Sequence, residues 1–321
     1  MAVLSYSGKY NYYFVISTIS TKIDKKSTCS PRHARPDRAS LIFGKDFVFL
    51  LPKSTALPML QYIADAFTDT LFAGNPAAVL LCKRMPEPAL MQAIAIENNY
   101  SETAFVVKRE KSHYDLKWFT PGGEVALCGH ATLATSFVLH QYVDKGVEEM
   151  HFHTKSGELI VTPEKNGYTM DFPVGPYKPI PITEAIQAAT NGLAKEAYYD
   201  GGDTIVVVDS ESDLAALTPD YDAMCKVDGR GLVITAKSKD AGYDFVSRCF
   251  YPKLNVPEDP VTGSAHTYLT PLWADKLGKT EMVARQLSPR GGTLHVRLAA
   301  PRVFITGQAV LFMQGEIPFD L

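Results

Sequence analysis

The chain has 321 residues, of which 46% are hydrophobic, and a formal net charge of −3. This length and composition fit a globular protein with one large domain or two medium ones. The slightly acidic balance argues against a nucleic-acid partner, because proteins that contact phosphates carry an excess of positive charge. No run of about 18 apolar residues is present, which argues against a membrane partner.

The five cysteines are odd in number and scattered, and no two form a Cys-x-x-Cys pair: Cys29, Cys82, Cys128, Cys225 and Cys249. Such spacing predicts neither a disulfide framework nor a structural zinc site. The short apolar stretch 12–19 contains Ser and Thr and is not followed by a small-residue cleavage site, so it does not indicate a signal peptide. Together these features predict a reducing, cytoplasmic location.

Residues 1–58 differ from the rest because they carry a net charge of +6, which leaves −9 for residues 59–321. The polar, basic stretch 22–40 buries too little apolar surface to offset the entropy of ordering, so a poorly ordered extension is predicted. A basic targeting segment and a nucleic-acid-binding arm are alternative interpretations. Because Met59 begins a strand-like run, a true start at Met59, with residues 1–58 an artefact of the gene model, is a further hypothesis.

From residue 59 onward, strands and helices are expected in turn. The first half predicts strands over 60–67 and 77–81, a turn at 72–76, a helix over 86–98, strands over 101–107 and 114–120, and a loop at 121–124. The run 131–142 is small and apolar on every side, which is typical of a buried helix. This run is expected to form the central helix of a lobe.

The second half repeats the pattern. It predicts strands over 151–153, 158–162 and 168–172, a proline-rich linker over 173–181, strands over 231–235 and 243–250, a loop over 252–262, and an apolar helix over 263–276. We therefore expect an α/β (α+β) fold of two similar lobes, each a mixed sheet wrapped around a central helix. Residues 59–175 would form the first lobe and 176–305 the second.

One internal parallel links the two halves. Gly129-His130-Ala131-Thr132 and Gly263-Ser264-Ala265-His266 each combine a glycine turn with the start of a buried helix. If the helix N-termini of two such lobes face each other, their free N–H groups and positive dipole ends point into the space between them. The parallel predicts an anion-binding site there.

Six short motifs, in order along the chain, resemble those of the PhzF-like (phenazine-biosynthesis-like) isomerase family. They are Tyr62-Ile63-Ala64-Asp65-Ala66-Phe67-Thr68, Phe72-Ala73-Gly74-Asn75-Pro76, Ser101-Glu102-Thr103-Ala104-Phe105, Phe119-Thr120-Pro121, Cys128-Gly129-His130-Ala131-Thr132 and Glu258-Asp259-Pro260-Val261-Thr262-Gly263-Ser264-Ala265-His266. The resemblance runs from Met59 to the end of the chain. It implies the diaminopimelate-epimerase-like fold, in which a last strand, here 309–313 within 306–321, completes the first lobe.

The resemblance also implies an isomerase that moves a proton between carbons of a small carboxylate substrate, with no cofactor and no metal, and it is compatible with a homodimer. Glu102 stands in the motif that holds the family's acid/base. A partly buried carboxyl suits this task, because it can take a proton and return it. Without the resemblance, Glu102 could equally be a loop carboxylate that caps a helix or pairs with a cation.

The same resemblance names companions for Glu102. His130, as a neutral imidazole at a helix N-terminus, would polarise substrate, and Asp259 would orient substrate or relay a proton. Asn75, Gly129, Gly263 and Ser264 are the expected substrate-binding residues. Ordinary structural roles compete with these interpretations: a core histidine, an Asx turn at Asp259, and turn geometry at Asn75.

Arg290 and Cys128 are two further candidates for the site. Arg290, beside Gly291-Gly292, is interpreted as part of a turn and as a minor candidate for anion contact, because no phosphate-binding fingerprint surrounds it. Cys128 resembles the first of two acid/base cysteines in epimerase and proline-racemase relatives, but Pro260 stands where the second is expected. A racemase or epimerase that uses Cys128, with a thiol pKa lowered by the helix N-terminus, remains an alternative, as does a non-catalytic small-molecule binding protein.

Overall fold

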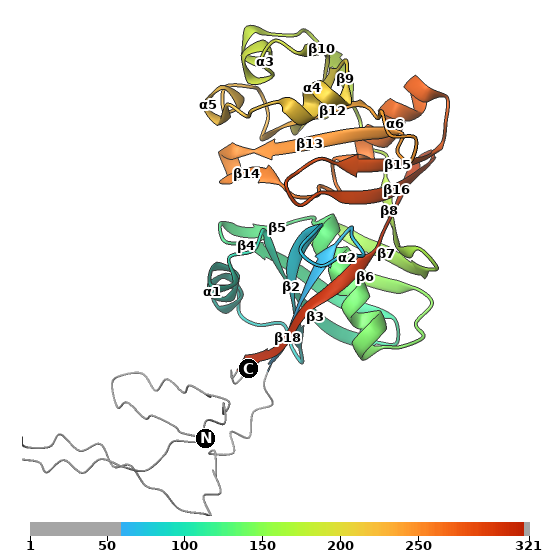
Figure 1. The fold of residues 1–321 in the computed structure, drawn as a ribbon. Coiled ribbons are helices and arrows are strands. Elements are labelled where there is room, and N and C mark those ends of the chain that lie inside the picture. The colour runs from blue at the N-terminus through green and yellow to red at the C-terminus, as the bar shows by residue number, and fades with distance from the viewer. Residues whose placement is uncertain (1–58, 318–321) are drawn as a thin grey trace, which may run out of the picture. The chain divides into compact units, whose positions relative to one another are not determined.

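The structure is a computed structural model that describes residues 59–317. The predictions for residues 1–58, including Cys29, lie outside the described residues, as do residues 318–321. The described residues belong to one compact unit. Within it, the described elements form two lobes, and each combines a mixed sheet with a buried helix, as the sequence predicts (Figure 1).

The first lobe contains the first eight strands and the last one. Its elements are β1 (Met59–Ala66), β2 (Asn75–Cys82), α1 (Pro88–Asn98), β3 (Glu102–Glu110), β4 (His113–Thr120), β5 (Gly123–Val125), α2 (Gly129–Val138), η1 (Leu139–Val143), β6 (Met150–Thr154), β7 (Gly157–Glu164), β8 (Gly167–Pro173) and β18 (Ala309–Ile317). The strand β18 returns to this lobe and pairs antiparallel with β1. The predicted strands of the first half are all present.

The second lobe contains the remaining elements. They are β9 (Lys178–Ile180), α3 (Glu184–Ala189), β10 (Ala194–Tyr199), β11 (Asp203–Val208), α4 (Glu211–Ala216), α5 (Tyr221–Met224), β12 (Gly231–Lys237), β13 (Phe245–Tyr251), η2 (Pro252–Leu254), β14 (Val256–Asp259), α6 (His266–Leu277), β15 (Glu281–Gln286), β16 (Gly292–Ala299) and β17 (Arg302–Gly307).

The strand order of the two lobes is the same. In the first lobe β2 is parallel to β3, β3 antiparallel to β4, and β4 parallel to β6, with β7 and β8 following as antiparallel neighbours. In the second lobe β11, β12, β13, β15, β16 and β17 repeat this sequence of pairings. Strand β17 also pairs antiparallel with β8, so one continuous sheet runs through both lobes.

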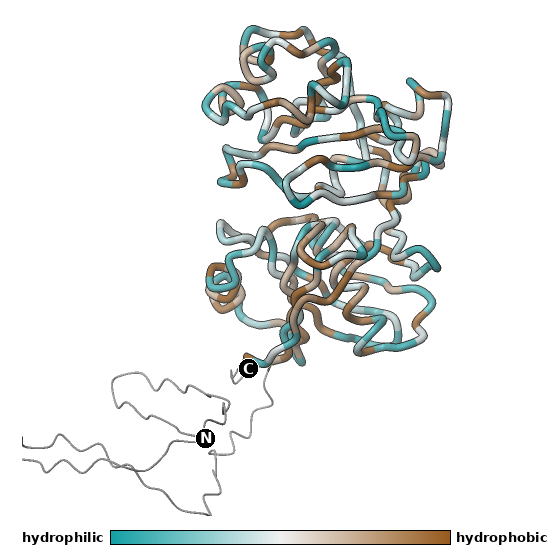
Figure 2. The backbone as a smooth tube through the Cα atoms, in the orientation of Figure 1, coloured by the Kyte–Doolittle hydropathy of each residue, from teal (hydrophilic) through white to brown (hydrophobic). Residues whose placement is uncertain are grey.

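The core of the first lobe lies around α2. Nine of its ten residues are buried, because alanine, glycine, serine and threonine let the surrounding strands approach closely on every side. Thr132, Thr135 and Ser136 satisfy their hydroxyls by donating to the carbonyl four residues earlier. Figure 2 shows the apolar segments concentrated inside each lobe, with hydrophilic segments along the peripheral loops.

Several predicted boundaries differ from the structure. The first buried helix begins at Gly129 rather than Ala131, and its last turn, Leu139–Val143, is a π-helix. The second begins at His266 rather than Gly263, because residues 263–265 form a turn whose carbonyls accept i+3 hydrogen bonds. The predicted loop 252–262 contains β14, since Glu258 pairs with Arg248 on the neighbouring strand. The predicted linker 173–181 contains β9, which pairs with β10.

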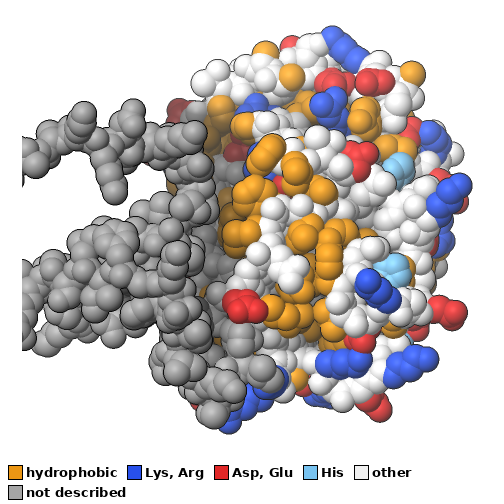
Figure 3. All heavy atoms as spheres, turned by 60° about the horizontal axis from the view of Figure 1, so that its bottom comes forward, with side chains coloured by type: hydrophobic (Ala, Val, Ile, Leu, Met, Phe, Trp, Pro, Cys, Tyr) orange, Lys and Arg blue, Asp and Glu red, His pale blue; other side chains and the backbone are white. Residues whose placement is uncertain are grey.

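Exposed apolar side chains lie together at β18 and at the turn between β1 and β2. Phe312 and Met313 of β18 are exposed, and the ring of Phe312 meets that of Phe72 edge to face at 5.9 Å. Figure 3 shows hydrophobic side chains gathered on one face of the molecule, with charged side chains spread around them. Among the described residues, no helix is both long and apolar enough to cross a membrane.

Candidate active site

Glu102 and His130 meet inside the first lobe. Glu102 is the first residue of β3, and its side chain is 18% exposed, whereas the side chain of His130, at the start of α2, is 6% exposed. Glu102 Oε2 lies 3.2 Å from His130 Nε2, but the contact lacks hydrogen-bond geometry, and neither atom has a hydrogen-bond partner among the described residues. The two groups therefore meet as a charge contact without a hydrogen bond, which leaves the carboxylate oxygen and the ring nitrogen available to a ligand.

Asn75 connects this pair to the second lobe. Its Nδ2 donates to Asp259 Oδ1 and to the carbonyl oxygen of Val261, both at 2.9 Å. These two bonds use both hydrogens of the Asn75 amide, so none is left for His130 Nδ1, which lies 3.2 Å from Asn75 Nδ2. The Nδ1–H of His130 can instead donate to Cys128 Sγ, at 3.6 Å. The buried Asn75 Oδ1 has no partner among the described residues, which leaves it available to a ligand.

Asp259 is held on both carboxylate oxygens. While Oδ1 accepts from Asn75, Oδ2 accepts from the hydroxyl of Thr262 at 2.5 Å. Gln286, at the end of β15, donates to the backbone oxygen of Asp259 at 2.7 Å and accepts from the backbone N–H of Thr262 at 2.8 Å. Thr262 and Gln286 were not identified from the sequence. A buried glutamine at the end of a strand carries no local signal that distinguishes it from a surface one.

The electrostatics of the site favour a protonated histidine. Burial lowers the pKa of His130, but the adjacent Cys128 and Glu102 outweigh this and hold that pKa well above its usual range. This differs from the neutral imidazole expected from the sequence, because the Glu102 carboxylate lies 3.2 Å from the ring. For Cys128, burial and the nearby Glu102 raise the thiol pKa, so the helix N-terminus does not produce the reactive thiolate of the alternative hypothesis.

Burial also raises the pKa of Asp259 from 3.8 to about 6, although the positive charge of His130 acts in the opposite direction. A raised native pKa means that the folded protein binds this proton more tightly than the unfolded chain. The associated stability is fully present below about pH 4 and is lost as the pH rises through about 6, an effect of about 3 kcal/mol.

Asp259→Asn should remove this dependence. We expect the difference in free energy of unfolding, wild type minus variant, to fall by about 2 kcal/mol between pH 4 and pH 7, as measured by urea unfolding at pH steps. Asp209→Asn, at an exposed aspartate, is the control, and its difference should change by less than about 0.5 kcal/mol. If the free energies of unfolding of wild type and Asp259→Asn changed with pH in parallel, Asp259 would not carry the raised pKa.

The starts of the two buried helices face each other, as the internal sequence parallel predicts. A methyl group added to Gly129 would meet the Cα of Gly263 at 3.4 Å, and one added to Gly263 would meet the Cα of Gly129 at the same distance. Neither α2 nor α6 has a side-chain cap at its N-terminus. Ser264, next to Gly263, is partly exposed. The close approach places two sets of backbone N–H groups near one point, where they suit an anion.

Arg290 does not belong to this anion site. Its guanidinium is occupied by the first lobe: Nη2 donates to Asp65 Oδ1 at 2.8 Å and to the carbonyl oxygen of Ala73 at 2.9 Å, and Nε donates to that of Gly74 at 2.8 Å. The backbone N–H of Gly74 also donates to the carbonyl oxygen of Gly291 at 2.8 Å. These contacts join the two lobes, and they account for Arg290 by a structural role.

The ligand atoms of Glu102, Cys128 and His130 lie within 4.8 Å of one another, a grouping that could hold a metal ion. The raised pKa of the Cys128 thiol opposes this, because a cysteine binds a metal as its thiolate.

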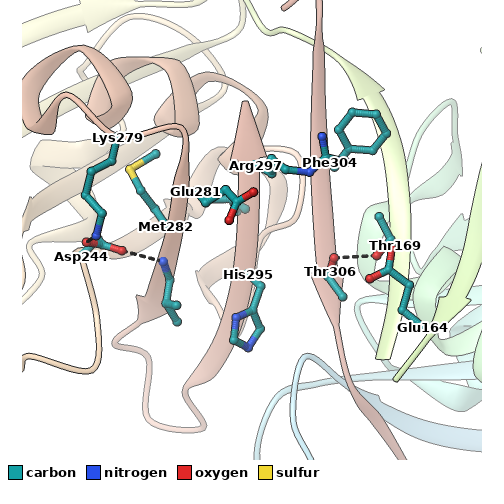
Figure 4. Close-up of a pocket in the computed structure, with 12 residues that line it drawn as sticks. Glu164, Thr169, Asp244, Lys279, Glu281, Met282, His295, Arg297, Phe304 and Thr306 are labelled. Atoms are coloured by element: carbon teal, nitrogen blue, oxygen red, sulfur yellow. Dashed lines mark hydrogen bonds and ion pairs between the residues drawn. The ribbon is translucent and has the colours of Figure 1, made fainter. Parts of the chain in front are cut away.

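A separate cavity of about 410 Å³ lies along β15, β16 and β17 (Figure 4) and includes none of the residues of the candidate site. Its charged lining mixes both signs, as in the Lys279–Asp244 ion pair and in Arg297 with Glu281.

Two lobes of matching topology, in which the starts of the two buried helices face each other, are the architecture of the diaminopimelate-epimerase-like fold class. The same fold occurs, at 20% identity and a TM-score of 0.62, in a predicted epimerase of Pseudomonas aeruginosa, covering 82% of this chain and 100% of that one.

The family profile described as phenazine biosynthesis-like protein, PhzC-PhzF, matches residues 64–315. An uncharacterised isomerase of Pseudomonas aeruginosa is 46% identical over 253 residues, which are 79% of this chain and 96% of that protein. The crystal structure of a PhzF-family protein from Enterococcus faecalis has a TM-score of 0.78 at 46% identity, covering 82% of this chain and 100% of that one. The chain belongs to the phenazine biosynthesis-like (PhzF) family.

Proposed function

We propose that this isomerase moves a proton from one carbon of a small carboxylate substrate to another, with Glu102 as the acid/base. The proposal rests chiefly on the contact between Glu102 and His130, in which two buried atoms lie 3.2 Å apart without hydrogen-bond partners in the described part of the chain. The Glu102 carboxylate takes a hydrogen from carbon as a proton. The electron pair left behind is shared with the conjugated substrate, and Glu102 returns the proton to a different carbon.

The other site residues bind and polarise the substrate in this proposal. The protonated His130 and the N–H groups at Gly129 and Gly263 face the negative charge of a carboxylate and of the intermediate, where fixed donors are most effective. Ser264 adds a hydroxyl beside the second helix start. Asn75 contributes its unpartnered Oδ1. Asp259 keeps Asn75 in position through the 2.9 Å bond, so we assign it a role in orienting the substrate.

The proposed reaction needs only groups that the chain supplies. A carboxylate that removes a proton and gives it back requires no change in oxidation state, so neither an electron carrier nor a second substrate takes part. Closure of the two lobes around the substrate would exclude water and strengthen these contacts. The intermediate would then be protected until Glu102 returns the proton.

The proposal is tested by incubating the full chain in D₂O with a panel of small carboxylic acids, followed by NMR. We expect at least one acid to lose a carbon-bound hydrogen signal and to gain deuterium at a different carbon. Because a single base can return the proton that it took, part of the product should stay unlabelled, so the shift of the C–H position is measured together with the label. Acids that bind the protein, as seen by line broadening, but show neither change would contradict the proposal.

A racemase that uses Cys128 is the competing enzyme hypothesis. The buried thiol lies 3.6 Å from His130 Nδ1, but its raised pKa opposes a thiolate base. We therefore expect Cys128→Ala to keep the rate of exchange in D₂O within about 10-fold of wild type, since the variant loses packing but no proton-transfer group. A loss as large as that from removing the Glu102 carboxylate would favour the thiol mechanism.

A further inference from the structure

A second cluster of potential ligands lies on the solvent face of the first lobe, away from the candidate active site. The pairing of β4 with β6 places His113 opposite His151, and the pairing of β6 with β7 places His153 opposite Glu158. Residues two apart on a strand share a face, so His151 and His153 lie on the same side of β6. Between them Phe152 is fully buried, and these histidines therefore point away from the core.

The side chains of this cluster converge closely. His113 Nδ1 and His153 Nε2 share a hydrogen bond at 3.2 Å, and the two rings stack with centroids 5.4 Å apart. Three potential ligand atoms, one each from His113, His153 and Glu158, lie within 4.8 Å of one another. Both histidines are partly buried, so their orientations are limited by the sheet beneath them.

These distances match the coordination shell of a small divalent metal ion. Two imidazole nitrogens that bind tetrahedral zinc at about 2.0–2.1 Å are separated by about 3.3 Å, close to the 3.2 Å between His113 and His153. A rotation of the exposed Glu158 side chain would bring a carboxylate oxygen into the third position, and water would occupy the fourth. Two histidines and a glutamate are a ligand set that zinc, copper and nickel prefer over magnesium and calcium.

His151 supports this arrangement from the side. Its Nδ1 lies 3.3 Å from Glu158 Oε1, its Nε2 lies 2.8 Å from Glu149 Oε1, and its ring stacks on His113 with centroids 4.6 Å apart. The ring thus holds Glu158 near the two ligand nitrogens and packs against one of the ligand rings. Such outer contacts orient metal ligands and are needed for tight binding.

We propose that His113, His153 and Glu158 form a binding site for a divalent transition-metal ion such as Zn²⁺. The three ligands come from three adjacent strands, β4, β6 and β7, so the ion would cross-link the outer face of the first-lobe sheet. Because the native sheet brings the three ligands together, the bound ion stabilises the folded state relative to the unfolded chain.

The test is a calorimetric titration of Zn²⁺ into the full chain after treatment with EDTA, together with thermal unfolding. We expect one equivalent of Zn²⁺ to bind to the wild type and raise its Tm, and this equivalent to be lost or weakened at least about 10-fold in His153→Ala and in Glu158→Gln. Mg²⁺ should not substitute.

Two control variants distinguish this site from others. His295→Ala removes an exposed histidine of the second lobe, and Glu102→Gln alters the other potential metal cluster of the described chain. Both should keep the Zn²⁺ equivalent that His153→Ala loses. Circular dichroism of each variant checks that the fold is retained. Equal stoichiometry and affinity in wild type, His153→Ala and Glu158→Gln would overturn the proposal, as would a wild type that binds no Zn²⁺.

Discussion

Glu102→Gln is expected to reduce the rate of carbon–hydrogen exchange by about 10³-fold, because a positioned acid/base contributes about 10²–10⁴-fold to such reactions. The substitution replaces one carboxylate oxygen by an amide nitrogen of similar size and removes the group that takes the proton. The substitution removes the negative charge that lies 3.2 Å from His130 but leaves a side chain of about the same volume there. The measurement is deuterium incorporation per unit time and per enzyme molecule in the acid identified by the D₂O screen.

The matched control is Glu110→Gln at the other end of the same strand. Glu110 is the last residue of β3 and is exposed, so its substitution removes the same charge far from His130. We expect the rate to stay within about 2-fold of wild type, as for most surface substitutions outside a site. If Glu102→Gln also stayed within that range while remaining folded, Glu102 would not be the acid/base.

The repeated pattern of elements could be predicted from local sequence. Runs rich in β-branched and aromatic residues marked ten of the described strands, and the two runs of small apolar residues marked α2 and α6, since a helix without a polar face has to be buried. The strands β10, β11, β15, β16 and β17 of the second lobe were not predicted. The prediction was poorest where a tertiary contact decides the conformation. The strand β14, for example, forms within the predicted loop 252–262, which holds three prolines, because Glu258 pairs with Arg248 on β13.

The candidate site could be predicted only in part. Nothing in the spacing of Glu102 distinguishes it from an ordinary carboxylate, and its selection depended on the ordered set of motifs. The contacts of Asn75 with Asp259 and Val261 join residues 184 and 186 positions apart, a separation at which no periodic pattern applies. The His-x-His pattern at 151–153 was visible in the sequence, but His113 becomes its neighbour only through the pairing of β4 with β6.

Arg290→Met is expected to destabilise the protein by about 2–4 kcal/mol, because it leaves the charge of Asp65 buried without its cation. The side chain of Asp65 is 4% exposed and that of Arg290 is 32% exposed, so the cost should lie below that of a fully buried pair. The substitution also removes the hydrogen bonds that Arg290 donates to the carbonyl oxygens of Ala73 and Gly74. The free energy of unfolding is measured by urea denaturation.

A second substitution separates the lost charge pair from the lost packing. In Asp65→Asn/Arg290→Met both charges are absent, while the amide of residue 65 can still accept from the backbone N–H of Phe72, as Asp65 does at 3.1 Å. We expect the double variant to recover at least about 1 kcal/mol relative to Arg290→Met, since the uncompensated buried charge is gone. Arg302→Met breaks the more exposed contact with Asp171 and should cost less than about 1 kcal/mol.

The position of Arg290 also predicts an effect on catalysis that stability alone does not. Arg290 binds the carbonyl oxygens of Ala73 and Gly74, immediately before Asn75, and the N–H of Gly74 donates to Gly291 in the opposite direction. Gly74 has φ +66°, and a Cβ there would lie 2.2 Å from the oxygen of Ala66, so this turn has little freedom to adjust. Loosening it would move Asn75 relative to Asp259. We therefore expect the folded fraction of Arg290→Met to exchange deuterium more slowly than wild type, whereas Arg302→Met should exchange at the wild-type rate.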